Sequence, residues 1–343
     1  MLYREADRKI PAAVALGAAI LSFALTTGAA RAQDKTYTMK ITLATVNDHI
    51  HAFGRNFAAA IEKNSGGRIK TELYPASQLG SIPRQTEGVQ FGAIQCQLVP
   101  PEFLVGLDER FEVMSAPGLV ASMAQGQRLA ADPAVLNLML GLGAEKGMHG
   151  VGLFMANPSA VVFKAPVRHL ADFKGKKIRI FPSPFQSVPF DRLGATGVAM
   201  SLGDVLPALQ QGAIDGAVGS PAIFTAFHYQ DAAKYAVETG QPAIFAIAEV
   251  SKKWYDALPS DLQQIIDRTA AAESVAINPQ ATEITENSRK LWAGSGGELI
   301  ELPPDEQASY LELLSNVAAE VSKAKPRLGE AYQIVSQAAA RLR

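Results

Sequence analysis

The sequence contains a single cysteine and no excess of either charge. Cys96 stands alone among 343 residues, so the chain cannot form an internal disulfide or a metal site built from several thiolates. Its 32 Lys and Arg residues nearly balance 33 Asp and Glu residues, which gives a net charge of −1. A chain without a basic surplus lacks the electrostatic attraction that holds nucleic acids. Disulfide-stapled scaffolds are therefore excluded, and a nucleic-acid partner is not expected.

Motifs of common catalytic sites are missing as well. Gly175-Lys176-Lys177 lacks the spacing of a nucleotide-binding loop, and neither G-x-S-x-G nor H-E-x-x-H occurs. The pair His49 and His51 could ligate a metal, but no third ligand can be named, so histidines of a loop near a cleft are the simpler interpretation. Cys96 lies within an apolar alternation, which favours a buried small hydrophobe over a nucleophile. We expect no metal and no cofactor.

The first 32 residues have the features of a secretory signal peptide. Three basic residues precede an apolar stretch over 10–30, and a small-x-small site, Ala30-Arg31-Ala32, follows. About 20 apolar residues could also span a bilayer, so a membrane anchor is the alternative. The A-x-A site, with the proline and glycines inside the stretch, favours cleavage after Ala32. No later segment reaches ~18 continuous apolar residues, so we expect a soluble, exported chain.

The length suggests about two domains at ~150 residues each. Alternating apolar and polar residues predict strands over 39–43, 69–73, 94–98 and 177–181. Apolar repeats at helical spacing predict helices from Phe53 to the Gly66-Gly67 pair, over 201–212, over about four turns from Ser260, and after Pro304. Ser260 and Gln263 have the spacing of a capping box. The strand–helix–strand order over 39–73 is the unit of α/β folds.

Arg179 is the most informative charged residue. It lies in a predicted strand between Ile178 and Ile180. Elements packed on its face of the strand would remove its guanidinium from water, and the group would then need an anion. Its planar set of donors matches a carboxylate with two parallel hydrogen bonds. From the pattern alone, an internal salt bridge or an exposed charge is the more common outcome.

Five segments in order resemble the solute-binding subunits of TRAP (tripartite ATP-independent periplasmic) transporters, the DctP-type family. They are 69–80 (IKTELYPASQLG), 170–179 (LADFKGKKIR) followed by LGA at 193–195, 208–216 (ALQQGAIDG), KY at 234–235, and Trp254 with 258–263 (LPSDLQ). The resemblance runs from about residue 38 to the C-terminus. It implies a two-domain α/β periplasmic binding protein with a ligand cleft between hinged domains and helices that cross between them. Domain I would comprise 33–156 plus 246–285, and domain II would comprise 157–245 plus 286–343.

In this family the arginine of the K-I-R strand binds the ligand's carboxylate, and Arg179 matches it. The other ligand-binding candidates are Phe181, Ser220, Ser159, Phe185, His51, Gln78 and Glu102. The better-known acidic-sugar binders have a second arginine about twenty residues before the strand, where this chain has Asn157-Pro158-Ser159-Ala160. They also commonly have an asparagine where Ser220 stands. Both changes replace a longer polar side chain by a shorter or apolar one, so fewer polar groups can contact a ligand. This favours a small monocarboxylate with an apolar or aromatic body.

The resemblance further implies a periplasmic monomer that delivers its ligand to the small and large membrane subunits of an ion-gradient-driven permease. Two alternatives stay open at this point. An exported lyase or hydrolase could use His49 or His51 beside an arginine-bound carboxylate. A binding protein of the same kind could instead supply a sensor or a different transporter.

Overall fold

The computed structural model describes residues 35–241 and 243–343. Tyr37–Arg343 form one compact unit. The predicted signal peptide, residues 1–32, lies outside the described residues. Among the helices that the structure does describe, none combines the length and the apolar character needed to cross a bilayer.

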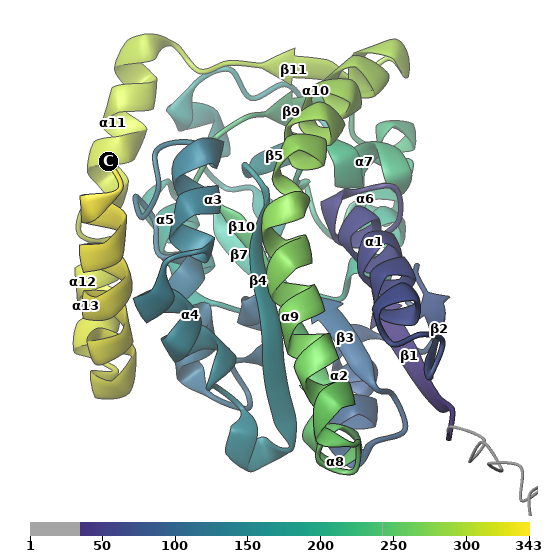
Figure 1. The fold of residues 1–343 in the computed structure, drawn as a ribbon. Coiled ribbons are helices and arrows are strands. Elements are labelled where there is room, and N and C mark those ends of the chain that lie inside the picture. Colours follow the sequence, from purple (N-terminus) through teal and green to yellow (C-terminus); the bar gives the residue numbers. More distant parts are fainter. Residues whose placement is uncertain (1–34, 242) are drawn as a thin grey trace, which may run out of the picture. The chain divides into compact units, whose positions relative to one another are not determined.

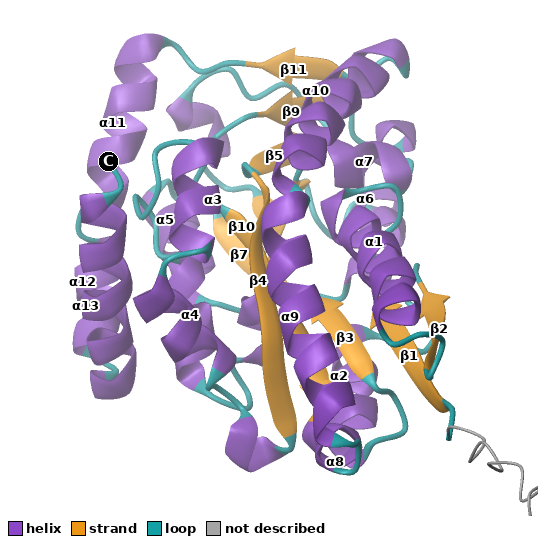
Figure 2. Ribbon diagram, in the orientation of Figure 1, coloured by secondary structure: helices purple, strands orange, loops and turns teal. Residues whose placement is uncertain are grey.

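Strands in the described residues form two sheets (Figures 1 and 2). The first has five strands in the order β2 (Ile69–Tyr74), β1 (Tyr37–Leu43), β3 (Cys96–Val99), β10 (Ile244–Ser251) and β4 (Met148–Asn157). The second has six in the order β11 (Glu298–Ile300), β9 (Tyr235–Val237), β5 (Ala160–Phe163), β8 (Gly216–Gly219), β6 (Lys177–Ile180) and β7 (Thr196–Ala199). β1 runs parallel to both of its neighbours, whereas β10 runs antiparallel to β3 and β4. The α/β class is confirmed, with mixed sheets.

Helices pack against both sheets (Figure 2). They are α1 (His49–Asn64), α2 (Ile82–Phe91), α3 (Met123–Ala130), α4 (Pro133–Leu140), α5 (Pro184–Arg192), α6 (Val205–Gln211), α7 (Pro221–Ala226), α8 (Lys252–Asp256), α9 (Ser260–Ala276), α10 (Asn278–Gly294), α11 (Pro304–Leu314), α12 (Val317–Lys323) and α13 (Pro326–Arg341). Two short 3₁₀ helices, η1 (Pro101–Leu104) and η2 (Glu109–Ser115), follow β3.

Helix α1 shows why this local sequence folds as predicted. Phe53, Phe57 and Ile61 are fully buried on one face. The chain leaves the helix through Gly66 and Gly67, whose φ angles of 63° and 79° are in the left-handed region that favours glycine. The helix begins at His49, so both histidines lie in its first turn. Their predicted placement in a loop is wrong, because the side chain of Asp48 caps the helix just before them.

Two other local predictions need correction. Helix α9 begins at Ser260 as predicted, but the capping box is wrong, since Pro259 is the N-cap. The side-chain amide of Gln263 instead donates to the carbonyl oxygens of Tyr255 (2.9 Å) and Leu258 (3.2 Å). The helix predicted over 201–212 is α6, preceded by a 3₁₀ turn over 202–204. Pro207 lies in the first turn of α6, where a backbone N–H has no acceptor within the helix.

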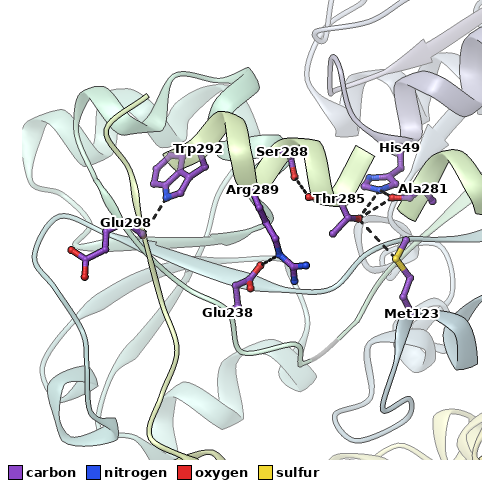
Figure 3. Close-up of polar contacts among 9 residues, drawn as sticks. All are labelled: His49, Met123, Glu238, Ala281, Thr285, Ser288, Arg289, Trp292 and Glu298. Atoms are coloured by element: carbon purple, nitrogen blue, oxygen red, sulfur yellow. Dashed lines mark hydrogen bonds and ion pairs between the residues drawn. The ribbon is translucent and has the colours of Figure 1, made fainter. Parts of the chain in front are cut away.

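Helix α10 joins the two sheets through side-chain contacts (Figure 3). Near its beginning, the ring Nε2 of His49 donates to the carbonyl oxygen of Ala281 at 2.7 Å. Further along, Arg289 Nε donates to Glu238 Oε1 at 2.7 Å, just after β9. At its end, Trp292 Nε1 donates to the carbonyl oxygen of Glu298 in β11 at 3.2 Å. The helix thus contacts α1 beside the first sheet and two strand ends of the second.

The chain passes between the sheets at the end of β4 and before β10. Only Pro158 and Ser159 separate β4 from β5. The predicted domain boundaries place 286–343 with the second sheet, whereas α13 packs against η2 and α4, and its buried residues share a core cluster with Leu153 and Ile247 of the first sheet. By packing, the C-terminal helix belongs with the first sheet. The boundaries themselves stay a prediction, because Tyr37–Arg343 form one unit.

The core of the first sheet contains an unusual acid, Glu249. It lies in β10, is fully buried, and neither carboxylate oxygen has a hydrogen-bond partner among the described residues. Burial raises the pKa of this carboxyl well above its usual value. The neighbouring Cys96 is also buried, and burial likewise raises the pKa of its thiol, as expected for a small hydrophobe rather than a nucleophile.

We expect Glu249 to make the stability of the fold depend on pH. The folded state holds the proton that the unfolded state releases above its ordinary pKa, so stability falls as pH rises from that value towards the raised one. Glu249→Gln has no proton to lose. The melting temperature of the variant minus that of the parent should therefore increase from pH 5 to pH 8. Glu87→Gln, at an exposed position, is the control, and a difference that stays constant across this range would contradict the prediction.

Candidate functional site

A cavity lies between the two sheets, lined by residues of both. Its apolar wall includes Leu98, Phe103, Phe181, Leu202, Ile223 and Ile244. The polar side chains that line it are those of Thr45, Asp48, Asn157 and Arg179. The empty space among these residues, including its opening to solvent, is about 540 Å³. Apolar walls with a few polar groups among them are typical of small-molecule sites.

Arg179 reaches this cavity from β6 of the second sheet. Its side chain is almost fully buried, with 1% of its surface exposed. Nε donates to the carbonyl oxygen of Met200 at 3.1 Å, and Nη1 donates to that of Val218 at 3.2 Å. The Cζ atom lies 5.0 Å from the centre of the Phe181 ring, a favourable distance for a cation–π contact. The guanidinium is thus held in one orientation by two carbonyls and an aromatic ring.

The charge of Arg179 has no counterpart in the described residues. No ion pair joins Arg179 to any described carboxylate. Burial lowers the pKa of the guanidinium to about 10, so it stays protonated at neutral pH. The pattern-based expectation of an internal salt bridge or an exposed charge is therefore wrong. A buried cation without an anion is energetically costly, and an anionic ligand would offset that cost.

Asp48 reaches the same cavity from the first sheet's side. Its Oδ1 accepts hydrogen bonds from the backbone N–H of His51 (2.9 Å) and the hydroxyl of Thr45 (2.8 Å). Its Oδ2 is buried and has no partner among the described residues. Burial raises the pKa of this carboxyl to about 6, against the opposing effect of the hydrogen bonds. Asp48 and Arg179 are thus two polar groups, one from each side, in one apolar cavity.

The predicted binding residues of the second sheet do not all reach the cavity. Phe181 lines it. Ser220 follows the lining residue Gly219, and its hydroxyl is buried without a partner in the described part of the chain. Ser159 lines a different hollow, beside Glu238 and Arg289. Phe185 is fully buried in the core cluster that contains Phe111 and Leu153.

None of the three residues predicted on the first sheet's side lines the cavity. His51 is half-buried, and its Nδ1 accepts a hydrogen bond from the backbone of Asn47. Gln78 is exposed in the turn after β2. Glu102 is buried next to the lining residue Phe103, and burial raises the pKa of its carboxyl to about 8. The two histidine rings have separate partners, and no cluster of metal-ligating side chains occurs in the described residues.

Sequence reasoning did not nominate Asp48 or Thr45 as site residues. Both lie just before α1, and an aspartate directly before an apolar helical repeat predicts a helix cap and nothing more. Their contribution to the cavity depends on where the second sheet lies. Asn157, by contrast, belongs to the segment where the acidic-sugar binders have an arginine, and it does line the cavity.

The arrangement of two mixed sheets around a cavity is shared with a known family. The sequence profile of DctP, the bacterial extracellular solute-binding protein family 7, matches residues 42–324. The chain belongs to this family. The expected kinship with TRAP solute-binding subunits is thereby confirmed, and this DctP-family protein is a binding protein of a transport system rather than an enzyme. The family is extracellular or periplasmic.

Relatives and solved structures agree with this assignment. The chain is 26% identical to the C4-dicarboxylate-binding periplasmic protein DctP of Rhodobacter capsulatus over 272 residues, 78% of this chain and 80% of the relative. It is 31% identical to a solute-binding protein of Albidiferax ferrireducens over 223 residues, 64% of this chain and 65% of the relative. A TRAP periplasmic solute binding protein from Desulfovibrio salexigens with bound orotic acid superposes with a TM-score of 0.84, at 21% identity over 90% of this chain and 100% of the other. The expected two-domain, clamshell-type fold is confirmed by this likeness.

Proposed function

We propose that this DctP-family protein captures a small organic acid in the cavity between its sheets and delivers it to a TRAP permease in the membrane. The observation that carries the proposal is the buried guanidinium of Arg179, which faces the cavity without an ion pair among the described residues. The hydrogen bonds to Met200 and Val218 use Nε and Nη1. Within the described part of the chain no hydrogen bond from Nη2 occurs, so this nitrogen would serve the ligand. A carboxylate placed here would gain a charge-assisted hydrogen bond in apolar surroundings.

A single carboxylate fits this cavity better than two. Among the described lining residues, Arg179 is the one cationic side chain, and Asp48 contributes an acid. Related structures hold both kinds of ligand: that from Desulfovibrio salexigens has bound orotic acid, and that from Shewanella oneidensis has bound succinate. We favour a monocarboxylate because a second carboxylate would find no second cation in the described lining. The phenyl rings of Phe103 and Phe181, 5.3 Å apart, offer an apolar surface for its body.

Binding would favour a closed arrangement of the two sheets. A ligand can shift an equilibrium only through contacts that differ between the two states. Arg179 comes from the second sheet, while Asp48 and Leu98 come from the first sheet's side. A ligand that touches both sides contributes more in a closed form than in an open one, which is the basis of hinge closure. Delivery to the permease then requires a membrane partner that binds the closed form in preference to the open one.

The proposal is tested by screening small organic acids against the mature protein. We expect one or a few acids to raise the melting temperature, because a ligand at 100 times its Kd stabilises the folded state by ~2.7 kcal/mol. Calorimetry should then give one site per chain, and the bound acid should be recovered unchanged. Uptake by vesicles that carry the small and large membrane subunits should require the protein. The proposal would be rejected if no acid in the screen raised the melting temperature, or if an Arg179 variant bound the acid as tightly as the parent.

A further inference from the structure

Capping of α1 does not account for both oxygens of Asp48. Its Oδ1 satisfies the cap and the Thr45 hydroxyl, whereas Oδ2 is buried and unpartnered within the described residues. Asp132 offers a comparison, because its Oδ1 caps α4 and its Oδ2 pairs with Arg341. Most buried polar atoms are hydrogen-bonded, and each exception calls for a physical explanation. At Asp48 the unexplained atom belongs to a side chain that lines the cavity.

We propose, building on the proposed function, that Asp48 Oδ2 accepts a hydrogen bond from the ligand, so that the protein selects acids with a hydroxyl or amino group remote from the carboxylate. The ligand's carboxylate would meet Arg179, and its donor group would meet Asp48. Apart from Thr45 and Asn157, the other residues that line the cavity are apolar, Phe103, Phe181 and Ile244 among them. The ligand is therefore a hydroxy- or amino-substituted monocarboxylate with an apolar middle.

The same geometry disfavours dicarboxylates. A ligand carboxylate at the Asp48 end would place two acids side by side in apolar surroundings. Like charges repel strongly where water does not screen them, and no lining Lys or Arg at that end is described to relieve the repulsion. A donor at that end instead completes the hydrogen bonding of Oδ2. Because Arg179 and Asp48 belong to opposite sides of the cavity, such a ligand also bridges them.

The test compares matched acids on the full mature protein by calorimetry. The probes are straight-chain sets of four, five and six carbons, plus a benzoate set. Each set contains the plain acid, the acid with a terminal hydroxyl, the acid with a terminal amine, and the dicarboxylate. In the best-fitting set, we expect the hydroxy or amino member to bind about 10- to 100-fold more tightly than the plain acid, as a hydrogen bond to a charged group contributes. The dicarboxylate should bind more weakly than the plain acid.

Asp48→Asn identifies the atom responsible. Asparagine caps helices as well as aspartate does, so the variant should fold, but it removes the negative charge. We expect the advantage of the hydroxy or amino member to fall at least tenfold and the dicarboxylate penalty to disappear. Asp132→Asn, also a helix cap but outside the cavity, should leave the parent ranking unchanged.

The outcomes separate this inference from the proposed function. Tightest binding of a dicarboxylate by the parent, or the parent ranking retained in Asp48→Asn, overturns the role of Asp48 while leaving capture by Arg179 intact. Binding of no probe at all, or equal binding by parent and Arg179→Lys, overturns both. The parent's ranking of probes is informative on its own if Asp48→Asn fails to fold.

Discussion

Arg179→Met is expected to abolish binding of the organic acid while making the ligand-free protein more stable. Loss of the guanidinium leaves the bound carboxylate buried and unpaired, which costs about 2–5 kcal/mol. At 1.4 kcal/mol per tenfold change, affinity falls by about 30- to 5,000-fold. Arg179→Lys should also bind poorly, because a point charge cannot reproduce the planar donors that orient a carboxylate.

The gain in stability follows from the burial of Arg179. Its pKa in the folded protein is lowered to about 10, so the folded state holds the proton less tightly than the unfolded state does. Burying the charged guanidinium therefore lowers the free energy of unfolding at every pH below about 10, and this effect fades above that pH. At neutral pH it amounts to about 3 kcal/mol, at 1.36 kcal/mol per pKa unit. The hydrogen bonds to Met200 and Val218 offset about 1 kcal/mol each. The cation–π contact with the Phe181 ring offsets part of the remainder. The net gain is therefore at most about 1 kcal/mol, which corresponds to a rise of at most about 2 °C in melting temperature.

Calorimetric titration and thermal denaturation on the same samples check both halves of this prediction. Arg84→Met, at an exposed arginine, is the matched control and should change neither affinity nor melting temperature. A variant that binds as the parent does would show that the carboxylate lies elsewhere. A variant that loses several degrees of melting temperature would show that Arg179 holds the fold together and that its lost affinity is indirect.

The sequence predicts local structure well because the signals are local. Alternation over β1 and β2 and the apolar repeat in α1 each depend on residues a few positions apart. The errors also have local causes. Ser260 and Gln263 have the residue types of a capping box, but Pro259 occupies the N-cap, and the Gln263 amide finds two backbone carbonyls instead. A pattern specifies which residues can form a contact, whereas competing partners decide which contact forms.

The candidate site is less accessible to sequence reasoning because it is built from both sheets. Arg179 could be nominated from its strand. Whether its charge pairs with an acid of the protein depends on every element that surrounds it, and none of the described residues supplies that acid. Asp48 has the sequence signature of a helix cap, and its second oxygen becomes informative only when the other sheet closes the cavity. Pairings between distant segments leave no local trace at all. The contact between Glu112 and Lys325, 213 residues apart, is an example.

Lys325→Met is expected to destabilise the protein by roughly 3 kcal/mol, since Glu112 would remain buried without its cation. Glu112 is fully buried in η2; its Oε1 accepts a hydrogen bond from Lys325 Nζ at 2.6 Å, and its Oε2 accepts one from the hydroxyl of Ser183 at 2.8 Å. Ser183 follows β6, the strand that carries Arg179, and also caps α5. The cluster thus connects the strand that carries Arg179 to η2 and to the start of α13.

A double-mutant cycle separates the charge from the packing at this cluster. Glu112→Gln in the Lys325→Met background removes the unpaired charge while keeping an oxygen for Ser183, so most of the lost stability should return. Denaturant unfolding of the parent, both single variants and the double variant gives the coupling energy. Lys252→Met, which breaks the exposed pair with Asp256, should cost less than about 1 kcal/mol. If Lys325→Met costs no more than this surface control, the buried carboxylate of Glu112 does not depend on Lys325, and the connection between α13 and the strand that carries Arg179 rests on apolar packing alone.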